Sequence, residues 1–169
     1  ARAFRGDADV AIPDVLAASE TVIVSEWLEG TPLSRVIAEG SPAERDAAAA
    51  LYLEFLLRGP NRARLLHADP HPGNFRITPD GRLGVLDFGA VDRLPHGLPA
   101  AMGRLVSQAV AGDAEALAEG LRSEGFLRPG VNVDAQALLD FLAPFLEPLH
   151  HEEYTLDRAW LRAQAARIQ

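Results

Sequence analysis

Residues 65–91 read LLHADPHPGNFRITPDGRLGVLDFGAV, a run in which polar residues and prolines interrupt short apolar segments. The tetrapeptide PDGR (79–82) lies between two such segments and consists of good turn formers, which predicts a β-hairpin over 75–86. The hairpin would place Asn74 directly before its first strand and Asp87 directly after its second. Because the two ends of a hairpin are adjacent, we expect the Asn74 amide and the Asp87 carboxylate to lie side by side.

An oxygen pair of this kind is suited to Mg²⁺, which takes a few hard oxygen ligands from protein and the rest from water and phosphate. Asn74 and Asp87 are therefore the candidate metal ligands. Asp69 lies five residues before Asn74, on a loop stiffened by two prolines and a glycine. A carboxylate there could orient an attacking hydroxyl or accept its proton. Phosphoryl transfer needs mainly positioning and charge neutralisation, so these residues predict half of such a site.

Two histidines in the same loop are further candidates for the catalytic machinery. His67 is most simply a residue that fixes the loop by hydrogen bonds, with catalytic proton transfer as the alternative. His71 lies two residues after Asp69, where it could contact phosphate or the Asp69 carboxylate.

HADPHPGN (67–74) has the form HxDxxxxN of a protein-kinase-like catalytic loop, and DFG (87–89) matches the metal-binding triplet. The residues of both motifs resemble those of the UbiB/ADCK (AarF-domain) family of atypical protein-kinase-like enzymes. This resemblance covers most of the chain. SEWLEGTPL is similar to the hinge of that family, which implies that backbone groups of Glu26 and Leu28 contact adenine. The resemblance also implies ATP and Mg²⁺ as cofactors, phosphoryl transfer or ATP hydrolysis as the activity, and a link to isoprenoid-quinone biosynthesis.

The chain contains no lysine, because all 16 of its basic residues are arginines. Kinase-like sites require an N-terminal lobe that holds a lysine on the α- and β-phosphates. The resemblance therefore implies a protein-kinase-like C-terminal lobe over 31–169, preceded over 1–30 by the last N-lobe strands and the hinge. We expect the missing N-lobe of the same protein to be its main partner, and this chain alone to bind nucleotide weakly and turn over poorly.

VAIPDV (10–15) and TVIVSEW (21–27) are rich in β-branched residues and predict two strands. Ser41-Pro42-Ala43-Glu44 forms a capping box, which opens a helix expected to end at Arg58, before Gly59. Further helices are predicted over 97–111, 113–124, 134–149 and 155–168. These proportions predict an α+β fold that is mostly helical.

The composition of the chain indicates which partners and which cellular compartment to expect. With 169 residues, 48% of them hydrophobic, the chain can bury one substantial core, and its net charge of −8 argues against nucleic acid or an anionic membrane. The absence of cysteine fits a reducing compartment, so a cytoplasmic location is expected. No apolar run approaches the roughly 18 residues that cross a bilayer, and membrane association is not visible in these residues.

Two alternatives to the UbiB/ADCK interpretation stay open. One is a small-molecule phosphotransferase of the aminoglycoside or choline kinase type, whose catalytic loop has a similar pattern. The other is a pseudokinase that binds a partner without transferring phosphate. Only about six residues separate Gly89 from the helix expected near Gly97, whereas peptide kinases use a long loop there to seat their substrate. This spacing favours a small-molecule or lipid-like acceptor, or ATP hydrolysis.

Overall fold

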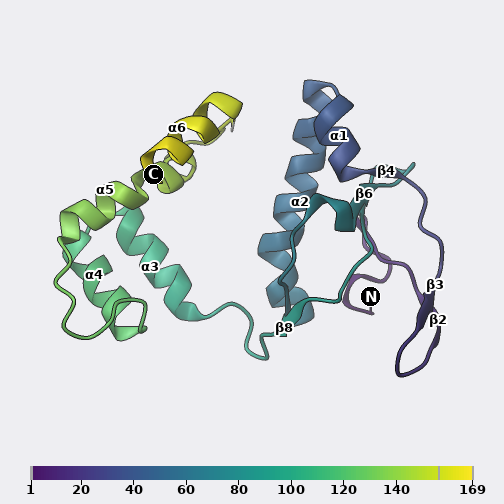
Figure 1. Cartoon of the computed structure of the whole chain (residues 1–169), viewed down its shortest axis with the longest axis horizontal. Coiled ribbons are helices and arrows are strands. Elements are labelled where there is room, and N and C mark those ends of the chain that lie inside the picture. The colour runs from purple at the N-terminus through teal and green to yellow at the C-terminus, as the bar shows by residue number, and fades with distance from the viewer. Residues whose placement is uncertain (1, 156, 169) are drawn as a thin grey trace. The chain divides into compact units, whose positions relative to one another are not determined.

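The fold comes from a computed structural model of the chain, which describes residues 2–155 and 157–168. The chain divides into two compact units, Ala1–Leu98 and Pro99–Gln169. The first unit combines short strands with two helices, and the second is helical (Figure 1). The fold is therefore a mixed one of helices and strands, with helix dominant.

The first unit contains three small sheets. Its elements in chain order are η1 (Arg2–Phe4), β1 (Val10–Ala11), β2 (Val15–Ala18), β3 (Ile23–Ser25), β4 (Thr31–Pro32), α1 (Leu33–Glu39), α2 (Pro42–Ala63), β5 (Leu65–His67), η2 (Pro72–Asn74), β6 (Phe75–Ile77), β7 (Leu83–Val85) and β8 (Val91–Arg93). One sheet has the order β1-β7-β6-β4, and the pairs β2–β3 and β5–β8 form the other two. All neighbouring strands are antiparallel except β1 and β7.

β6 and β7 pair in antiparallel register, with Phe75 opposite Val85 and Ile77 opposite Leu83. This pair occupies the residues for which the sequence predicted a hairpin. Gly81 lies in its turn at a φ of +84°, a conformation that glycine adopts without strain. Phe75, Leu83 and Val85 are completely buried, so the hairpin is anchored in the core of the first unit.

The helix α2 begins at the predicted capping box. The Ser41 hydroxyl accepts a hydrogen bond from the Glu44 backbone N–H at 3.3 Å, and Glu44 Oε2 accepts one from the Ser41 N–H at 2.8 Å. Together these bonds satisfy amide groups that the first helical turn leaves without partners.

The predicted end of this helix at Arg58 is wrong. α2 continues through Gly59 and Pro60 to Ala63. Gly59 and Pro60 are buried, and Gly59 packs near the ring of Phe4. Glycine and proline disfavour a helix interior by about 1 and 3 kcal/mol, but burial of the last turn against the core outweighs this local preference.

The core of the first unit lies between α2 and the sheet that contains the hairpin. Its buried members are Phe4, Val10, Leu33, Ala48, Phe55, Phe75, Leu83 and Val85. Edge-to-face contacts connect the helix to the strands, since Tyr52 and Phe55 on α2 both meet the ring of Phe75. The site residues on either side of the hairpin therefore stand on a packed base.

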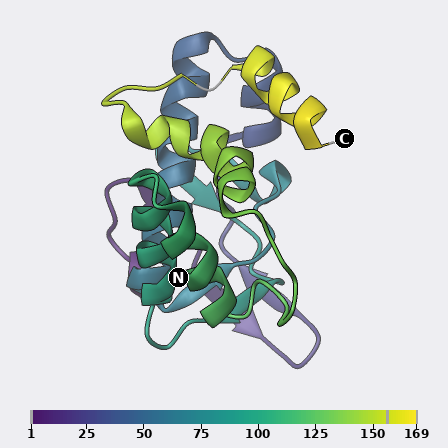
Figure 2. The ribbon, with the colours of Figure 1, turned by 90° about the vertical axis from the view of Figure 1, so that its left-hand side faces the viewer.

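The second unit consists of α3 (Ala100–Val110), α4 (Ala114–Ser123), α5 (Ala135–Leu146), η3 (Glu147–His150) and α6 (Arg158–Ile168). α3 and α4 run side by side in both Figure 1 and Figure 2. Its core is built from Ala109, Leu117 and Leu139. The four helices predicted from the sequence are present, with different bounds. α3 and α6 begin at Ala100 and Arg158, each three residues later than expected, and the helix predicted over 134–149 is α-helical only to Leu146. In the part of the chain that the structure describes, no helix is both long and apolar enough to span a bilayer.

Candidate functional site

Two short strands hold the loop 67–74 and the triplet 87–89 against each other. β5 leads into the loop, and β8 follows the triplet in the chain. The two strands pair with Leu65 opposite Arg93 and His67 opposite Val91. One residue further along, the Ala68 N–H donates to the Ala90 carbonyl at 2.9 Å. Neither strand was predicted from the sequence, because three residues are too few to show an alternating pattern.

His67 lies at the end of β5 with 8% of its surface exposed. Its Nε2 donates a hydrogen bond to the backbone carbonyl of Asp87 at 2.7 Å, which fixes the proton on that nitrogen. The ring packs against Phe55, Phe75 and Phe88. Its Nδ1 is buried and has no hydrogen-bond partner among the described residues. This environment suits a residue that holds the triplet in place.

Asp69 and Asn74 are brought into direct contact. The Asn74 amide group donates to Asp69 Oδ2 at 2.9 Å and to the Asp69 backbone carbonyl at 3.2 Å. Both bonds use Nδ2, so the carbonyl oxygen of the Asn74 amide is left to accept a ligand. The loop therefore presents a carboxylate whose orientation is set by the neighbouring amide.

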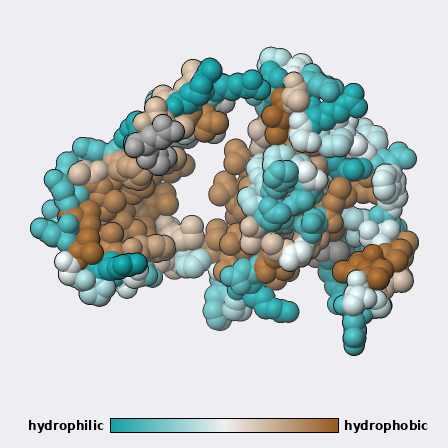
Figure 3. Space-filling model, in the orientation of Figure 1, coloured by the Kyte–Doolittle hydropathy of each residue, from teal (hydrophilic) through white to brown (hydrophobic). Residues whose placement is uncertain are grey.

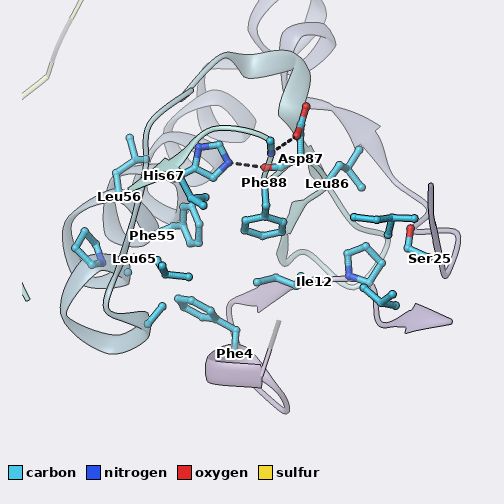
Figure 4. A pocket seen from close by; sticks show the side chains of 18 residues that line it. Phe4, Ile12, Ser25, Phe55, Leu56, Leu65, His67, Leu86, Asp87 and Phe88 are labelled. Carbon is cyan, nitrogen blue, oxygen red and sulfur yellow. Dashed lines mark hydrogen bonds between the residues drawn. The ribbon is translucent and has the colours of Figure 1, made fainter. Parts of the chain in front are cut away.

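Asp87 is connected to Asn74 through the backbone of the hairpin, because the Leu86 N–H donates to the Asn74 carbonyl at 2.9 Å. Asp87 Oδ1 accepts from the Gly89 N–H at 2.6 Å, which curls the triplet around the carboxylate. Figure 4 shows the Asp87 carboxylate directed away from the cavity that Phe88 lines. Within the triplet, the apolar side chain of Phe88 therefore lines the cavity, and the acidic side chain of Asp87 points away from it.

His71 stabilises the loop that follows Asp69. Its Nδ1 accepts a hydrogen bond from the Gly73 N–H at 3.0 Å, and the side chain caps the short helix η2. The Asn74 N–H in turn donates to the His71 carbonyl at 2.9 Å. A contact of His71 with a phosphate would therefore have to come from Nε2.

Glu26 and Leu28 lie on the segment between β3 and β4. Glu26 is tied to Asp14 twice, by its N–H to the Asp14 carbonyl at 3.0 Å and by its Oε2 to the Asp14 N–H at 3.1 Å. The Leu28 carbonyl accepts from Arg76 Nη1 at 2.5 Å. Arg76 lies on β6, two residues after Asn74, and its guanidinium also stands 5.8 Å from the Trp27 ring. The segment that contains Glu26 and Leu28 is thus fastened to the strand that follows the loop.

Arg76 was not among the residues expected to build the site. A charged residue between the apolar residues of a buried strand was the available signal, because such a side chain needs a partner when it is buried. The partner itself lies 48 residues away and could not be read from the local pattern.

A cavity of about 620 Å³ lies behind the triplet within the first unit. Figure 4 shows Phe4, Phe55, Phe88 and Ile12 directed into it, and His67 and Asp87 lie at its edge. Its lining is mostly apolar. The volume falls in the range of pockets that hold small organic ligands.

Asn74 and Asp87 carry side-chain oxygens of the kind that bind a metal, but by themselves they do not form a complete metal site. Over residues 2–155 and 157–168, no three His, Cys, Asp or Glu side chains come close enough together to hold an ion. Mg²⁺ is the ion for which a small protein contribution is sufficient, since phosphates and water fill its remaining positions. The donor set therefore fits Mg²⁺ bound together with a phosphate, and does not fit a closed structural metal.

A mixed α/β chain with a loop of the form HxDxxxxN and a nearby DFG triplet is typical of kinase-like proteins. The model of the ABC1 atypical kinase-like domain matches residues 1–121. The chain belongs to this family.

Two curated proteins of Arabidopsis thaliana are similar to this chain. Protein ACTIVITY OF BC1 COMPLEX KINASE 3, chloroplastic, of Arabidopsis thaliana is 36% identical over 143 residues, which cover 82% of this chain and 20% of that protein. An uncharacterised chloroplastic aarF domain-containing protein kinase of the same plant is 33% identical over 145 residues, or 81% of this chain and 19% of that protein. The chain thus spans about a fifth of the length of these relatives.

Among solved structures, the complex of Rv3197 with erythromycin from Mycobacterium tuberculosis is similar in fold. It matches with a TM-score of 0.89 and 32% sequence identity, over 96% of this chain and 42% of that chain.

Proposed function

We propose that this chain carries the metal-binding and catalytic-loop half of a Mg·ATP-dependent atypical kinase or ATPase of the UbiB/ADCK type. The observation that carries the proposal is the connection of the loop to the triplet by His67–Asp87, Ala68–Ala90 and Asn74–Leu86 hydrogen bonds. Membership of the ABC1 atypical kinase-like family supports it. The chain spans a small part of its relatives, so the activity belongs to the parent protein, by which we mean the longest natural protein that contains these residues.

Asn74 and Asp87 are the proposed metal ligands. Asn74 donates through Nδ2 to Asp69, which turns its amide oxygen outward, and Asp87 receives the Gly89 N–H on Oδ1, which leaves Oδ2 for the metal. Bound Mg²⁺ would neutralise charge on the phosphates of ATP. In this proposal the hairpin β6–β7 would hold the two side chains near each other, because Asn74 precedes its first strand and Asp87 lies after its second.

Asp69 is the proposed catalytic residue. Its carboxylate would orient an acceptor hydroxyl or a water, or accept the proton that this group loses. The bond from Asn74 restricts its rotation, which lowers the entropic cost of reaching a reactive geometry. His67 and His71 would act through position: His67 holds Asp87, and His71 holds the turn before Asn74.

Glu26 and Leu28 are proposed to contact adenine through their backbones, as the family resemblance implies. The Asp14 and Arg76 bonds support this, because they hold the segment rigid without using the Leu28 N–H. Arg76 also connects the segment to β6, so the adenine and the phosphates would be held by one continuous piece of structure.

An N-terminal lobe of the parent protein is proposed to cover the pair β2–β3 and to supply the missing lysine. This pair and the turn between its strands form a brown area in Figure 3. Its exposed apolar side chains are Val15, Leu16, Val22, Ile23 and Val24. Both strands belong to a two-stranded sheet with unpaired outer edges, to which further strands can add. Residues 1–30 would then belong to the N-lobe and hinge, and 31–169 to the C-lobe.

The acceptor is proposed to be a small molecule or a lipid-like compound, with ATP hydrolysis as the alternative outcome. Ten residues separate Gly89 from α3, and three of them form β8. This leaves little chain to seat a peptide substrate. A link to isoprenoid-quinone synthesis rests on the family resemblance alone.

Mg²⁺-dependent nucleotide binding tests the proposal. In the parent protein, Asp87→Asn should weaken Mg·ATP binding at least tenfold in calorimetric titration, while binding without Mg²⁺ changes little, because a neutral amide is a poorer Mg²⁺ ligand. Asp92→Asn is the matched control, since Asp92 is an exposed carboxylate on β8 whose side chain bonds the neighbouring Arg93 N–H. Equal affinities of the wild type and Asp87→Asn in the presence of Mg²⁺ would disprove the metal assignment.

A second candidate function is binding of a bulky, mostly apolar small molecule. The cavity behind the triplet favours it, and the relative from Mycobacterium tuberculosis was solved with the macrolide erythromycin. Substitution of Phe55 on the cavity wall by Trp should fill part of the space and weaken erythromycin binding by the parent protein. Unchanged erythromycin affinity in this variant would exclude the cavity as the site.

A further inference from the structure

Tyr52 on α2 connects that helix to the loop that contains Asp69. Its hydroxyl donates a hydrogen bond to the Pro70 carbonyl at 2.5 Å. The ring of the half-buried Tyr52 lies edge-on to Phe75, with the ring centroids 5.1 Å apart. The aromatic contact fixes the direction of the side chain, and the hydroxyl then fixes the loop.

The Pro70 carbonyl is a sensitive place to hold the loop, because it belongs to the residue that directly follows Asp69. On one side of this residue the Ala68 N–H bonds to Ala90, and on the other the Asn74 N–H bonds to the His71 carbonyl. Pro70 has no N–H of its own to donate. The Tyr52 hydroxyl thus holds the part of the loop that lies between two backbone attachments.

The electrostatic environment keeps the Tyr52 hydroxyl in the form that can donate. Burial raises the pKa of Tyr52 above its ordinary value, and the negative charge of Asp69 raises it further. The phenol therefore remains protonated at physiological pH.

We propose that Tyr52 is a positioning residue that sets the direction of the Asp69 carboxylate by holding the Pro70 carbonyl. Two hydrogen bonds from different elements then restrain Asp69: the Asn74 amide bonds its carboxylate oxygen, and the Tyr52 hydroxyl bonds the carbonyl of the following residue, Pro70. The proposal rests on the proposed function, since it assumes that Asp69 takes part in the reaction. The ring of Tyr52 packs against the core of the first unit, and its hydroxyl has this separate partner in the loop.

Tyr52→Phe is the decisive variant because it keeps the ring against Phe75 and removes the hydroxyl alone. In the parent protein, kcat for ATP turnover should fall about fivefold, which corresponds to loss of one net hydrogen bond of about 1 kcal/mol. The KM for ATP should not change, since Tyr52 does not contact the nucleotide-binding residues. Amide hydrogen exchange should accelerate over residues 68–74 and remain unchanged in the core strands β6 and β7.

Tyr154→Phe is the matched control. Tyr154 is the other tyrosine of the chain and lies in the second unit, where its ring stacks on His151. This variant should change neither kcat nor exchange over residues 68–74.

The outcomes separate the two proposals. If Asp69→Asn abolishes turnover while Tyr52→Phe alters neither kcat nor exchange over 68–74, the positioning role is wrong and the proposed function stands. If the wild-type parent protein does not turn over ATP, the proposed function fails, and the exchange measurement still decides whether Tyr52 holds the loop. A purely structural role predicts faster exchange throughout the first unit and a lower melting temperature with kcat unchanged, which would also overturn the proposal.

Discussion

The imidazole of His67 is hydrogen-bonded to the backbone carbonyl of Asp87, with 2.7 Å between Nε2 and the oxygen. A buried side chain at the end of β5 thereby sets the backbone of a residue twenty positions later, whose own side chain points to the other side (Figure 4). This hydrogen bond connects the core of the first unit to the backbone of Asp87, the proposed metal ligand.

Replacement of His67 by Ala should lower both stability and metal affinity. It removes the donor for a carbonyl and leaves a cavity among three aromatic rings, so the free energy of unfolding should fall by about 2–4 kcal/mol in urea denaturation. Mg·ATP binding by the parent protein should weaken as well. His96→Ala, in an exposed turn, is the control. Unchanged stability and affinity in His67→Ala would show that the bond has no part in either.

Gly30 lies where the segment after Leu28 approaches the strand β6. Its φ is +145°, and a Cβ atom there would stand 2.4 Å from the Ile77 carbonyl oxygen. Gly30→Ala should destabilise the first unit by about 3 kcal/mol or more, because strain and a backbone clash add. Gly81→Ala is a matched control, since Gly81 also has a positive φ but a Cβ there meets no atom within 4 Å.

Gly81→Ala should therefore cost only about 1 kcal/mol, the usual penalty for a non-glycine residue at positive φ. The two variants are compared by the loss in their free energy of unfolding, measured by thermal or urea unfolding. The difference gives the cost of the steric clash at Gly30. Equal effects would mean that the chain near Gly30 moves away from β6 at little cost.

Asp7 should make the first unit sensitive to acid. Burial alone would raise the pKa of this carboxyl, but the N–H groups of Asp9 and Val10 and the guanidinium of Arg62 outweigh it and hold the pKa below the ordinary value. Since the pKa is lower in the folded state than in the unfolded state, Asp7 contributes stability above its unfolded pKa. That contribution is lost as the pH falls through the folded pKa.

The Asp7→Asn variant tests this directly. Its free energy of unfolding should fall less steeply than that of the wild type between about pH 5 and pH 3, and the two proteins should differ most at neutral pH. Glu119→Gln, in an exposed ion pair of α4, should follow the wild-type slope. Parallel curves for Asp7→Asn and the wild type would contradict the assigned role of this carboxyl.

Local signals account for what the sequence predicted well. The Ser41–Glu44 capping box and the turn around Gly81 depend on residues within a few positions of one another, and both are present in the structure. The candidate residues Asp69, Asn74 and Asp87 were chosen because their spacing follows a motif, and their roles stay predictions. The structure places Asp69 and Asn74 in contact.

The contacts that hold the site depend on residues far apart in sequence. Tyr52 and Pro70 are 18 positions apart in the sequence, and Leu28 and Arg76 are 48 positions apart. No local sequence pattern therefore predicts either contact. The extension of α2 past Gly59 has the same origin, since tertiary burial outweighs local propensity there. The three-residue strands β5 and β8 form for a related reason, because each is stabilised by the other across the chain.

The rate of ATP turnover by the parent protein, compared between the wild type and Asp69→Asn at saturating Mg·ATP, tests the central claim most directly. The account predicts that Asp69→Asn lowers kcat by at least 100-fold and changes the affinity for Mg·ATP by less than about threefold, because Asp69 orients the attacking group and does not hold the nucleotide. An Asp69→Asn protein that turns over ATP at the wild-type rate would contradict the assignment of this loop as a phosphoryl-transfer site.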